Sequence, residues 1–223
     1  MEEHEEILER LLGRYPALHS ARTEILAAFQ GMRECFLRGG RLLVCGNGGS
    51  SADAQHMVGE LMKEFRRGRG LDPDFAEECR KLYPGEGLEK KLQPALPAIA
   101  LGTNQAFATA YANDVCPEMV YAQEVFAYGR KGDVLLGFST SGNSENVINA
   151  VKVARARKIV CIGAGGRSGG RLRALCDIYV ELPAEENYLV QELTMPLYHA
   201  WCEMLESAFW PGGAFFDRDK AEG

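Results

Sequence analysis

Two predicted helices of this 223-residue chain each carry a histidine and an oxygen-bearing side chain on one face. His56 and Glu60 stand four residues apart, and Gln191 and His199 stand eight apart, so each pair shares one side of its helix. Nitrogen and oxygen donors of these types could hold one zinc-like ion or move protons in catalysis. Each histidine alone is also typical of a hydrogen-bonded, half-buried ring, so the spacing leaves both interpretations open.

A glycine-rich loop, residues 46–51, precedes the helix that carries His56. Its backbone N–H groups and the positive N-terminus of the helix suit an anion such as phosphate. The loop is not a P-loop, because the Lys-Ser/Thr pair is absent. It matches the dinucleotide-binding pattern only in part, since Ser51 replaces the last glycine and no acidic residue closes the next strand. A tight turn that happens to be rich in glycine is the alternative.

A second loop gathers four hydroxyl side chains between a predicted strand and a helix: Ser139, Thr140, Ser141 and Ser144. Ser144 could be a helix N-cap, and one or two of the others could be turn residues. Four hydroxyls exceed what capping requires, and they suit the several hydrogen bonds that a phosphate accepts.

Five short apolar runs alternate with helical patterns and position these loops. The predicted strands are residues 41–45, 96–101, 133–138, 159–162 and 178–182. Strands that are apolar throughout and separated by helices predict a parallel sheet covered on both faces. Both loops then lie at the carboxyl ends of strands, where open parallel sheets bind ligands.

The rest of the chain is predicted to complete a single domain, residues 1–223. Amphipathic helices occupy about residues 2–38, the helix of His56 runs from 52 to about 65, and a long closing helix runs from about 186 to 209. Residues 66–95 break the alternation, with helical character only near residues 75–82, and are predicted to be an insertion.

Composition narrows the class of protein. The chain is 46% hydrophobic and 25% charged, which excludes a disordered protein, and its net charge of −6 disfavours nucleic acid and anionic membranes as partners. No apolar stretch has the ~20 residues of a membrane span, and the acidic N-terminus is unlike a secretory signal. Seven scattered cysteines without a Cys-x-x-Cys pair favour a reducing compartment, so we expect a cytoplasmic protein.

Several motifs together resemble the bacterial phosphoheptose (sedoheptulose 7-phosphate) isomerases of the sugar isomerase (SIS) superfamily. They are residues 45–61, which read Cys-Gly-Asn-Gly-Gly-Ser-Ser-Ala-Asp-Ala-Gln-His-Met-Val-Gly-Glu-Leu, the pair Asn113-Asp114, residues 132–144, and Gln191-Glu192 with His199. The resemblance spans about residues 20–208 apart from the insertion. It implies the SIS fold, a three-layer α-β-α sandwich around a five-stranded parallel sheet.

The resemblance also implies an activity. Such enzymes convert D-sedoheptulose 7-phosphate to D-glycero-D-manno-heptose 7-phosphate through an enediol, which supplies precursors of nucleotide-heptoses and surface polysaccharides. By this resemblance Glu60 is the base, His199 is the acid, and one zinc ion per subunit is held by His56, Glu60, Gln191 and His199. The implied substrate-binding residues are Asn47, Gly48, Gly49, Glu60, Asn113, Asp114, Ser139, Thr140, Ser141, Ser144 and Gln191. Family members are homotetramers with sites at subunit interfaces, so a homotetramer is expected. Asp53 matches a motif position to which no role is assigned.

The sequence departs from the family pattern in places. Ser51 and Thr194 stand where the family often has histidine, and the 66–95 segment is longer than the usual connection. These departures leave open an isomerase of another sugar phosphate. A related branch of phosphosugar-binding proteins, which associate with the replication initiator, lacks the acid–base pair, whereas this chain has both Glu60 and His199.

Overall fold

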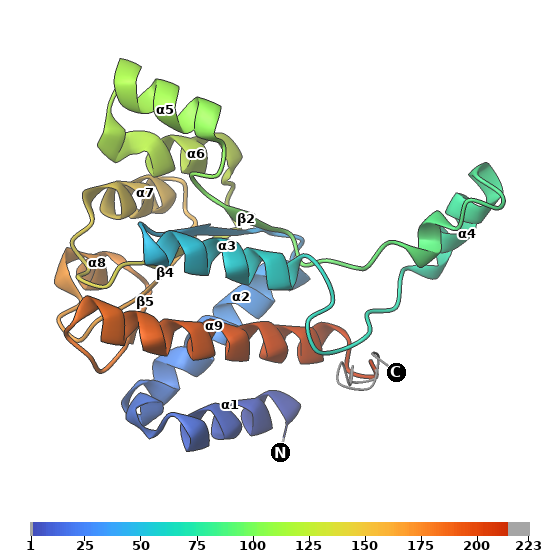
Figure 1. The fold of residues 1–223 in the computed structure, drawn as a ribbon, viewed down its shortest axis with the longest axis horizontal. Coiled ribbons are helices and arrows are strands. Elements are labelled where there is room, and N and C mark those ends of the chain that lie inside the picture. Colours follow the sequence, from blue (N-terminus) through green and yellow to red (C-terminus); the bar gives the residue numbers. More distant parts are fainter. Residues whose placement is uncertain (1, 214–223) are drawn as a thin grey trace.

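A five-stranded parallel sheet forms the centre of the molecule, as the sequence predicts. The structure is a computed structural model that describes residues 2–213; the outermost residues of the predicted domain lie outside this range. The sheet has the order β2-β1-β3-β4-β5, and every neighbouring pair is parallel (Figure 1). The strands are β1 (Leu42–Cys45), β2 (Ala98–Ala100), β3 (Val134–Phe138), β4 (Val160–Gly165) and β5 (Ile178–Glu181).

Helices cover both faces of the sheet, which confirms the three-layer sandwich. One face packs against α2 (Arg22–Leu37), α3 (Gly49–Leu61) and α9 (Asn187–Phe209), and α1 (Glu3–Arg14) lies on α9. The other packs against α6 (Val120–Tyr128), α7 (Glu145–Ala156) and α8 (Gly170–Leu175), with α5 (Gln105–Asp114) lying on α6. Side chains alternate between the layers along each strand, so Leu42 and Val44 join the first core and Leu43 joins the second.

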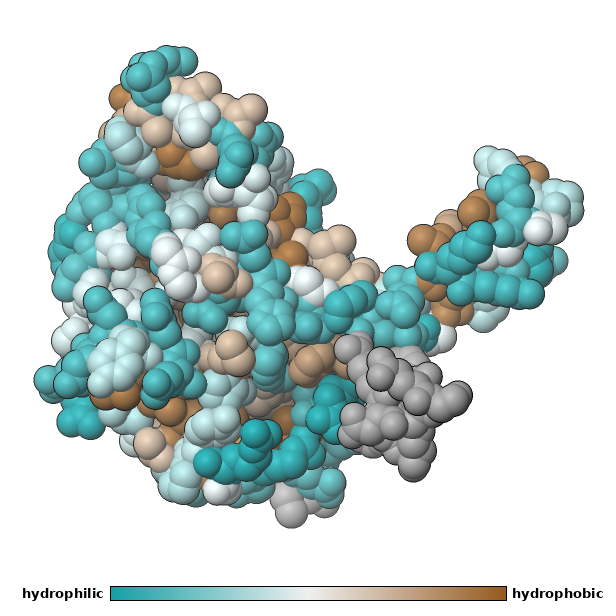
Figure 2. All heavy atoms as spheres, in the orientation of Figure 1, coloured by the Kyte–Doolittle hydropathy of each residue, from teal (hydrophilic) through white to brown (hydrophobic). Residues whose placement is uncertain are grey.

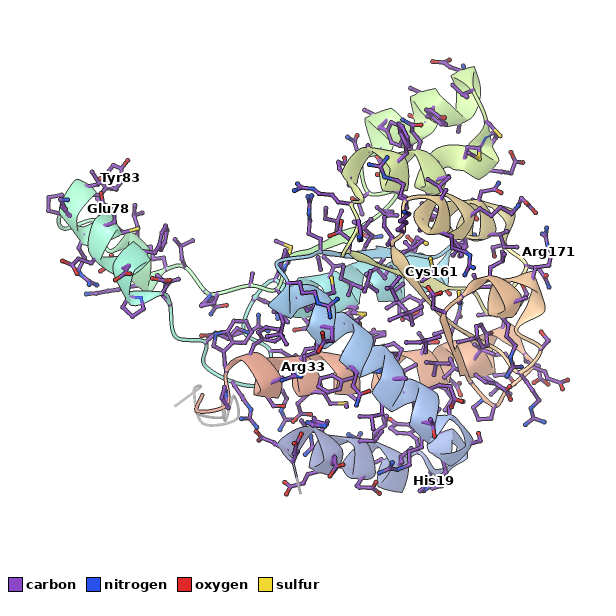
Figure 3. All side chains as sticks on the ribbon, turned by 180° about the vertical axis from the view of Figure 1, so that it is seen from behind. His19, Arg33, Glu78, Tyr83, Cys161 and Arg171 are labelled. Carbon is purple, nitrogen blue, oxygen red and sulfur yellow. The ribbon has the colours of Figure 1, made fainter. Side chains whose placement is uncertain are left out.

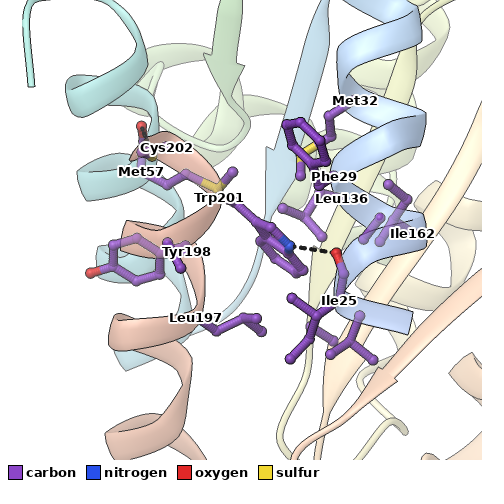
Figure 4. Packing of buried hydrophobic residues seen from close by; sticks show 14 of the residues in the cluster. Ile25, Phe29, Met32, Met57, Leu136, Ile162, Leu197, Tyr198, Trp201 and Cys202 are labelled. Carbon is purple, nitrogen blue, oxygen red and sulfur yellow. Dashed lines mark hydrogen bonds between the residues drawn. The ribbon is translucent and has the colours of Figure 1, made fainter. Parts of the chain in front are cut away.

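The larger core lies between α2, α9 and the sheet (Figure 4). Trp201 is fully buried there, and its indole N–H donates to the Ile25 carbonyl at 3.0 Å. The indole N–H is the one polar group of this side chain, and a buried donor without a partner would destabilise the fold. The bond to Ile25 therefore removes that cost. The bond also fixes α9, which carries predicted site residues, against α2.

Helix α3 begins and ends earlier than predicted. It starts at Gly49 and ends at Leu61, whereas the apolar pattern predicts residues 52 to about 65. The early end has a distant cause. The Glu206 carboxylate on α9 accepts the backbone N–H groups of Phe65, Arg66 and Arg67 at 2.8–3.0 Å, which turns these residues out of the helix.

The predicted insertion is anchored in the core at its beginning. Arg67 and Arg69 are only 3% and 4% exposed. Beyond them the chain leaves the body and returns as an arm, which we define as residues 71–92. The arm contains α4 (Pro73–Leu82) and a short 3-10 turn, Leu88–Lys90, and it stands away from the rest of the molecule (Figure 1). Among the described residues, no helix is long and apolar enough to cross a membrane.

Candidate active site

The two predicted anion loops follow the neighbouring strands β1 and β3, at the point where the order in which the chain adds strands to the sheet reverses. The chain passes from β1 outward to β2 on one side, while β3 pairs with β1 on the other, with Cys45 opposite Gly137. Loops that leave neighbouring strands in opposite directions open a crevice at their carboxyl ends. Asn47 follows β1 and Ser139 follows β3, so both predicted loops border this crevice.

Asn47 is held by side chains from α6 and α7. Its amide makes a reciprocal pair of 2.8 Å hydrogen bonds with the Asn146 amide. Tyr121 donates to the Gly46 carbonyl at 2.5 Å, and its hydroxyl lies 3.2 Å from the Asn47 side-chain oxygen. Burial raises the pKa of Tyr121 to about 12, so the phenol stays protonated at neutral pH. The loop is therefore oriented before any ligand binds.

The two glycines that follow have separate roles. Gly48 has φ of 56°, a left-handed conformation that favours glycine. A Cβ atom on Gly49 would lie 2.5 Å from the side-chain nitrogen of Gln191, so glycine there admits the Gln191 amide to the start of α3. The structure thus places Gln191 beside the first loop, and its role in substrate binding stays a prediction.

The hydroxyl loop is closed by its own hydrogen bonds. Ser139 is buried, and its hydroxyl lies 3.1 Å from that of Ser144. Ser144 occupies the N-cap position of α7, but its side chain makes no capping bond. The Ser141 hydroxyl is exposed and accepts the Asn143 N–H at 3.2 Å, and Thr140 is half-buried between them. A cleft lined by Thr140, Ser141, Asn143 and residues after β4 and β5 opens beside these hydroxyls.

His56 and Glu60 form a pair on α3, as their spacing predicts. The His56 Nε2 atom lies 3.3 Å from a Glu60 carboxylate oxygen. The other oxygen of Glu60 is 2.6 Å from the ammonium group of Lys63. The second ring nitrogen of His56, Nδ1, is 2.9 Å from the Tyr198 hydroxyl on α9. The His56 ring is therefore held between the Glu60 carboxylate, which accepts hydrogen bonds, and the Tyr198 hydroxyl, which can donate one.

His199 lies beside this pair from the neighbouring helix. Its ring centre is 5.0 Å from that of His56, and its Nε2 atom is buried with no hydrogen-bond partner within residues 2–213. Desolvation, with a smaller contribution from the neighbouring His56, lowers the pKa of His199, so the ring is neutral at pH 7. A buried polar nitrogen without a hydrogen-bond partner destabilises the folded state, so the Nε2 atom of His199 is a candidate for contact with a ligand or an ion. We call His56, Glu60, Tyr198 and His199 the His–Glu cluster.

Asp53, to which the sequence assigns no role, lies next to this cluster, beside Tyr198 and His56. It is 8% exposed, burial raises the pKa of its carboxyl, and its hydrogen bond to Tyr198 partly offsets that shift. The chain of contacts therefore runs from Asp53 through the Tyr198 hydroxyl to His56 and on to Glu60. Sequence reasoning missed Tyr198 because its role depends on how α3 and α9 align. Lys63 could have been found, since it lies three residues after Glu60 on the same helix.

The His–Glu cluster has part of what a metal ion needs. The free Nε2 of His199 and the adjacent His56–Glu60 pair are suitable zinc donors. Gln191 lies eight residues before His199, which is about 12 Å along α9 at 1.5 Å per residue, and it contacts Gly49 instead. Within the described part of the chain, no three His, Cys, Asp or Glu side chains are already arranged around one point. Zinc therefore stays a prediction.

Two predicted residues stand apart from both loops and the cluster. Asn113 and Asp114 end α5, where the Asn113 amide donates to the Asp114 carboxylate at 2.8 Å. Helix α5 lies on α6 at the outer edge of the molecule (Figure 1). Within residues 2–213, no hydrogen bond or ion pair joins either side chain to the other predicted site residues.

Comparisons with known proteins show the family and the fold of the chain. A SIS domain is recognised over residues 81–166. The chain is 40% identical over 172 residues to a phosphoheptose isomerase of Desulfovibrio desulfuricans, covering 77% of this chain and 70% of that protein. It is 35% identical over 186 residues to one of Campylobacter jejuni, covering 83% and 87%. The solved phosphoheptose isomerase of Neisseria gonorrhoeae superposes with a TM-score of 0.67 at 33% identity, covering 89% of this chain and 98% of that one. That of Francisella tularensis gives 0.71 at 29% identity, covering 93% and 100%.

Proposed function

This chain belongs to the phosphoheptose isomerase family of SIS-domain proteins and is an isomerase, and we propose that its substrate is D-sedoheptulose 7-phosphate. The product is D-glycero-D-manno-heptose 7-phosphate, a precursor for nucleotide-heptose and surface-polysaccharide synthesis. One observation carries the proposal: a carboxylate, Glu60, lies beside two histidines on two packed helices, one of which, α3, begins at the first anion loop.

In the proposed reaction Glu60 removes a proton from C1 of the ketose, next to the C2 carbonyl, and the C1–C2 enediol forms. The same proton, or one exchanged with water, returns to C2, while the O1 hydroxyl proton moves to O2 through His199. The neutral ring of His199 can donate a proton from one nitrogen and accept one at the other. The Ser139–Ser144 loop and the backbone of Gly48 and Gly49 hold the phosphate, which fixes the reacting end.

The proposal includes one zinc ion per subunit. His56, Glu60 and His199 would hold it, and when bound it would stabilise negative charge on the enediolate oxygens. Gln191 completes the predicted ligand set; its amide lies beside Gly49, about 12 Å along α9 from His199. Elemental analysis should find about one zinc per chain in the wild type and much less in His56→Ala and His199→Ala. Equal metal content in all three would remove these histidines from the ligand set.

The activity test replaces Glu60 with glutamine, which keeps the size of the side chain and removes the basic oxygen. Turnover of sedoheptulose 7-phosphate, followed by NMR of the product, should fall by at least the ~10²–10⁴-fold of general base catalysis. Binding measured by calorimetry should persist. The matched control is Glu64→Gln, since Glu64 lies four residues after Glu60, beyond the end of α3, and accepts hydrogen bonds from the Gln93 amide and the Arg69 backbone N–H instead. Normal turnover in Glu60→Gln would refute the assignment.

Two alternatives are distinguished by the same assay. A phosphosugar-binding protein without an acid–base pair would bind the sugar and leave it unchanged. The comparisons do not favour it, because the relatives described above are isomerases and both Glu60 and His199 are present. An isomerase of another sugar phosphate would be recognised by turnover of that sugar and not of the heptulose.

We further propose a homotetramer in the cytoplasm, with sites completed between subunits. The separation of Asn113 and Asp114 from the His–Glu cluster supports a shared site, and seven free cysteines suit a reducing compartment. Co-expressed Glu60→Gln and Asp114→Ala chains test the shared site. If each site combines these residues from two chains, random mixing restores about a quarter of the sites, although each variant alone is inactive. Mixed assemblies without activity would show that one chain supplies both.

A further inference from the structure

A second loop lines the cleft beside the hydroxyl loop, and the proposed reaction assigns it no role. We call it the β4 loop, residues 166–169, because it joins β4 to α8. At its start the Gly166 N–H donates to the Thr140 carbonyl at 3.0 Å. Just beyond its end the Leu172 N–H donates to the Gly142 carbonyl at 2.9 Å. Backbone hydrogen bonds therefore join the β4 loop to the hydroxyl loop on both sides.

Glycines allow this close approach of the two loops. Gly142 and Gly169 have φ of 65° and 68°, in the left-handed region that favours glycine. A Cβ atom on Gly142 would overlap the Gly169 carbonyl, so no larger residue fits there without moving one of the loops. The position of the β4 loop relative to the hydroxyl side chains is therefore set by the fold itself, before any ligand binds.

Three arginines follow β4, and two of them form ion pairs within the fold. Arg171 bonds to Glu145 at 2.5 Å, and Arg173 bonds to Glu181 at 2.8 Å. Figure 3 shows Arg171 at the surface of α8. Arg167 is exposed and lines the cleft, and its guanidinium makes no hydrogen bond or ion pair with the part of the chain that the structure describes. Arg167 is thus the arginine of this segment that is available to an anion.

The cleft is polar, and it needs a cation to hold an anion. Its lining side chains, apart from one alanine, are three hydroxyls, two amides, one carboxylate and one guanidinium: Thr140, Ser141, Ser168, Asn143, Asn187, Glu185 and Arg167. Figure 2 shows that the surface over α8 and the start of α9 is mainly hydrophilic. The chain has a net charge of −6, so its overall field repels an anion, and hydroxyls add no charge to oppose it. The guanidinium supplies that charge.

From the fixed β4 loop and the unpaired guanidinium, we propose that Arg167 binds the phosphate of the sugar substrate, together with the hydroxyl loop. The inference rests on the proposed function, which makes the substrate a sugar phosphate. Two N–H groups of one guanidinium match two phosphate oxygens, while the hydroxyls donate to the others. Arg167 therefore determines specificity, because hydroxyls alone also accept neutral oxygen ligands, whereas the guanidinium favours the charged phosphate.

Titration with inorganic phosphate, followed by ³¹P NMR, tests this role without turnover. Arg167→Gln should weaken phosphate binding about tenfold or more, the effect of losing hydrogen bonds to a charged group. Arg167→Lys should recover part of the affinity, because it keeps the charge but not the paired N–H groups. Arg171→Gln is the matched control and should bind as the wild type does. Glu185→Gln removes a negative charge from the cleft, so it should bind phosphate at least as tightly.

Steady-state kinetics then distinguish the substrate's phosphate from an unrelated anion. Inorganic phosphate should compete with sedoheptulose 7-phosphate, and Arg167→Gln should raise KM about tenfold or more while kcat changes much less. Non-competitive inhibition, an unchanged KM, or equal phosphate affinity in Arg167→Gln and the wild type would overturn the role of Arg167 and leave the isomerase assignment intact. A wild type that does not turn over the heptulose, but whose phosphate binding depends on Arg167, would refute the proposed sugar and support the role of Arg167.

Discussion

Replacing Glu206 with glutamine should destabilise the protein more than any exposed charge replacement. The carboxylate accepts three backbone N–H groups and the Arg69 guanidinium, at 2.8–3.0 Å, and its exposure is 0%. Glutamine has one accepting oxygen where glutamate has two, so two of these donors lose their partner. The substitution also leaves the Arg69 charge buried without a counter-ion. Removing one partner of a buried pair costs about 3–5 kcal/mol.

That cost can be measured as a shift of the melting temperature. For a chain of this size, each kcal/mol lowers Tm by about 2–4 °C, so the expected fall is roughly 6–20 °C. Circular dichroism should record it at one fixed protein concentration, because the stability of an oligomer depends on concentration. The control is Glu9→Gln, which breaks the exposed 2.7 Å pair with Arg22 and should cost about 0–1 kcal/mol. Equal melting temperatures for the two variants would refute the argument that Glu206 fixes the base of the arm.

The remaining predictions concern the hydroxyl loop, the arm and a buried acid. Ser139→Ala with Ser141→Ala should raise KM strongly, since each hydrogen bond to a charged phosphate contributes about 1.5–3 kcal/mol; unchanged kinetics would remove this loop from the site. A Gly/Ser linker in place of residues 71–92 should leave Tm nearly unchanged, whereas a deletion that includes Arg69 should yield insoluble protein, as solubility and melting curves will show. Burial raises the pKa of Glu124 above its ordinary 4.5, so the wild type should lose stability relative to Glu124→Gln as pH rises from about 4.5 to 7; a Tm difference that stays constant over this range would contradict that shift.

The sheet could be predicted from the sequence because its signals are local. Each strand is a short apolar run, four of the five are followed by glycine or hydroxyl residues, and the structure confirms all five strands. The end of α3 could not be predicted in this way. Phe65 continues the apolar period of that helix, but its N–H group belongs to Glu206, which lies 141 residues later. A contact between residues so distant in sequence overrides local propensity and leaves no trace in the residues around Phe65.

The site residues, too, separate into contacts within one helix, which the sequence predicts, and contacts between helices, which it does not. Spacing of four residues was enough to pair His56 with Glu60, because one helix sets their distance. The Tyr198 contact depends on how α3 packs on α9, and periodicity within either helix does not contain that register. Some residues that the motifs group together lie far apart within this chain. Glu60 stands eleven residues after Gly49, about 16 Å along α3 at 1.5 Å per residue, and Asp114 lies on a separate outer helix. The proposed homotetramer, with sites shared between subunits, would bring together residues that the motif groups and one chain keeps apart, and the mixed Glu60→Gln and Asp114→Ala chains test this.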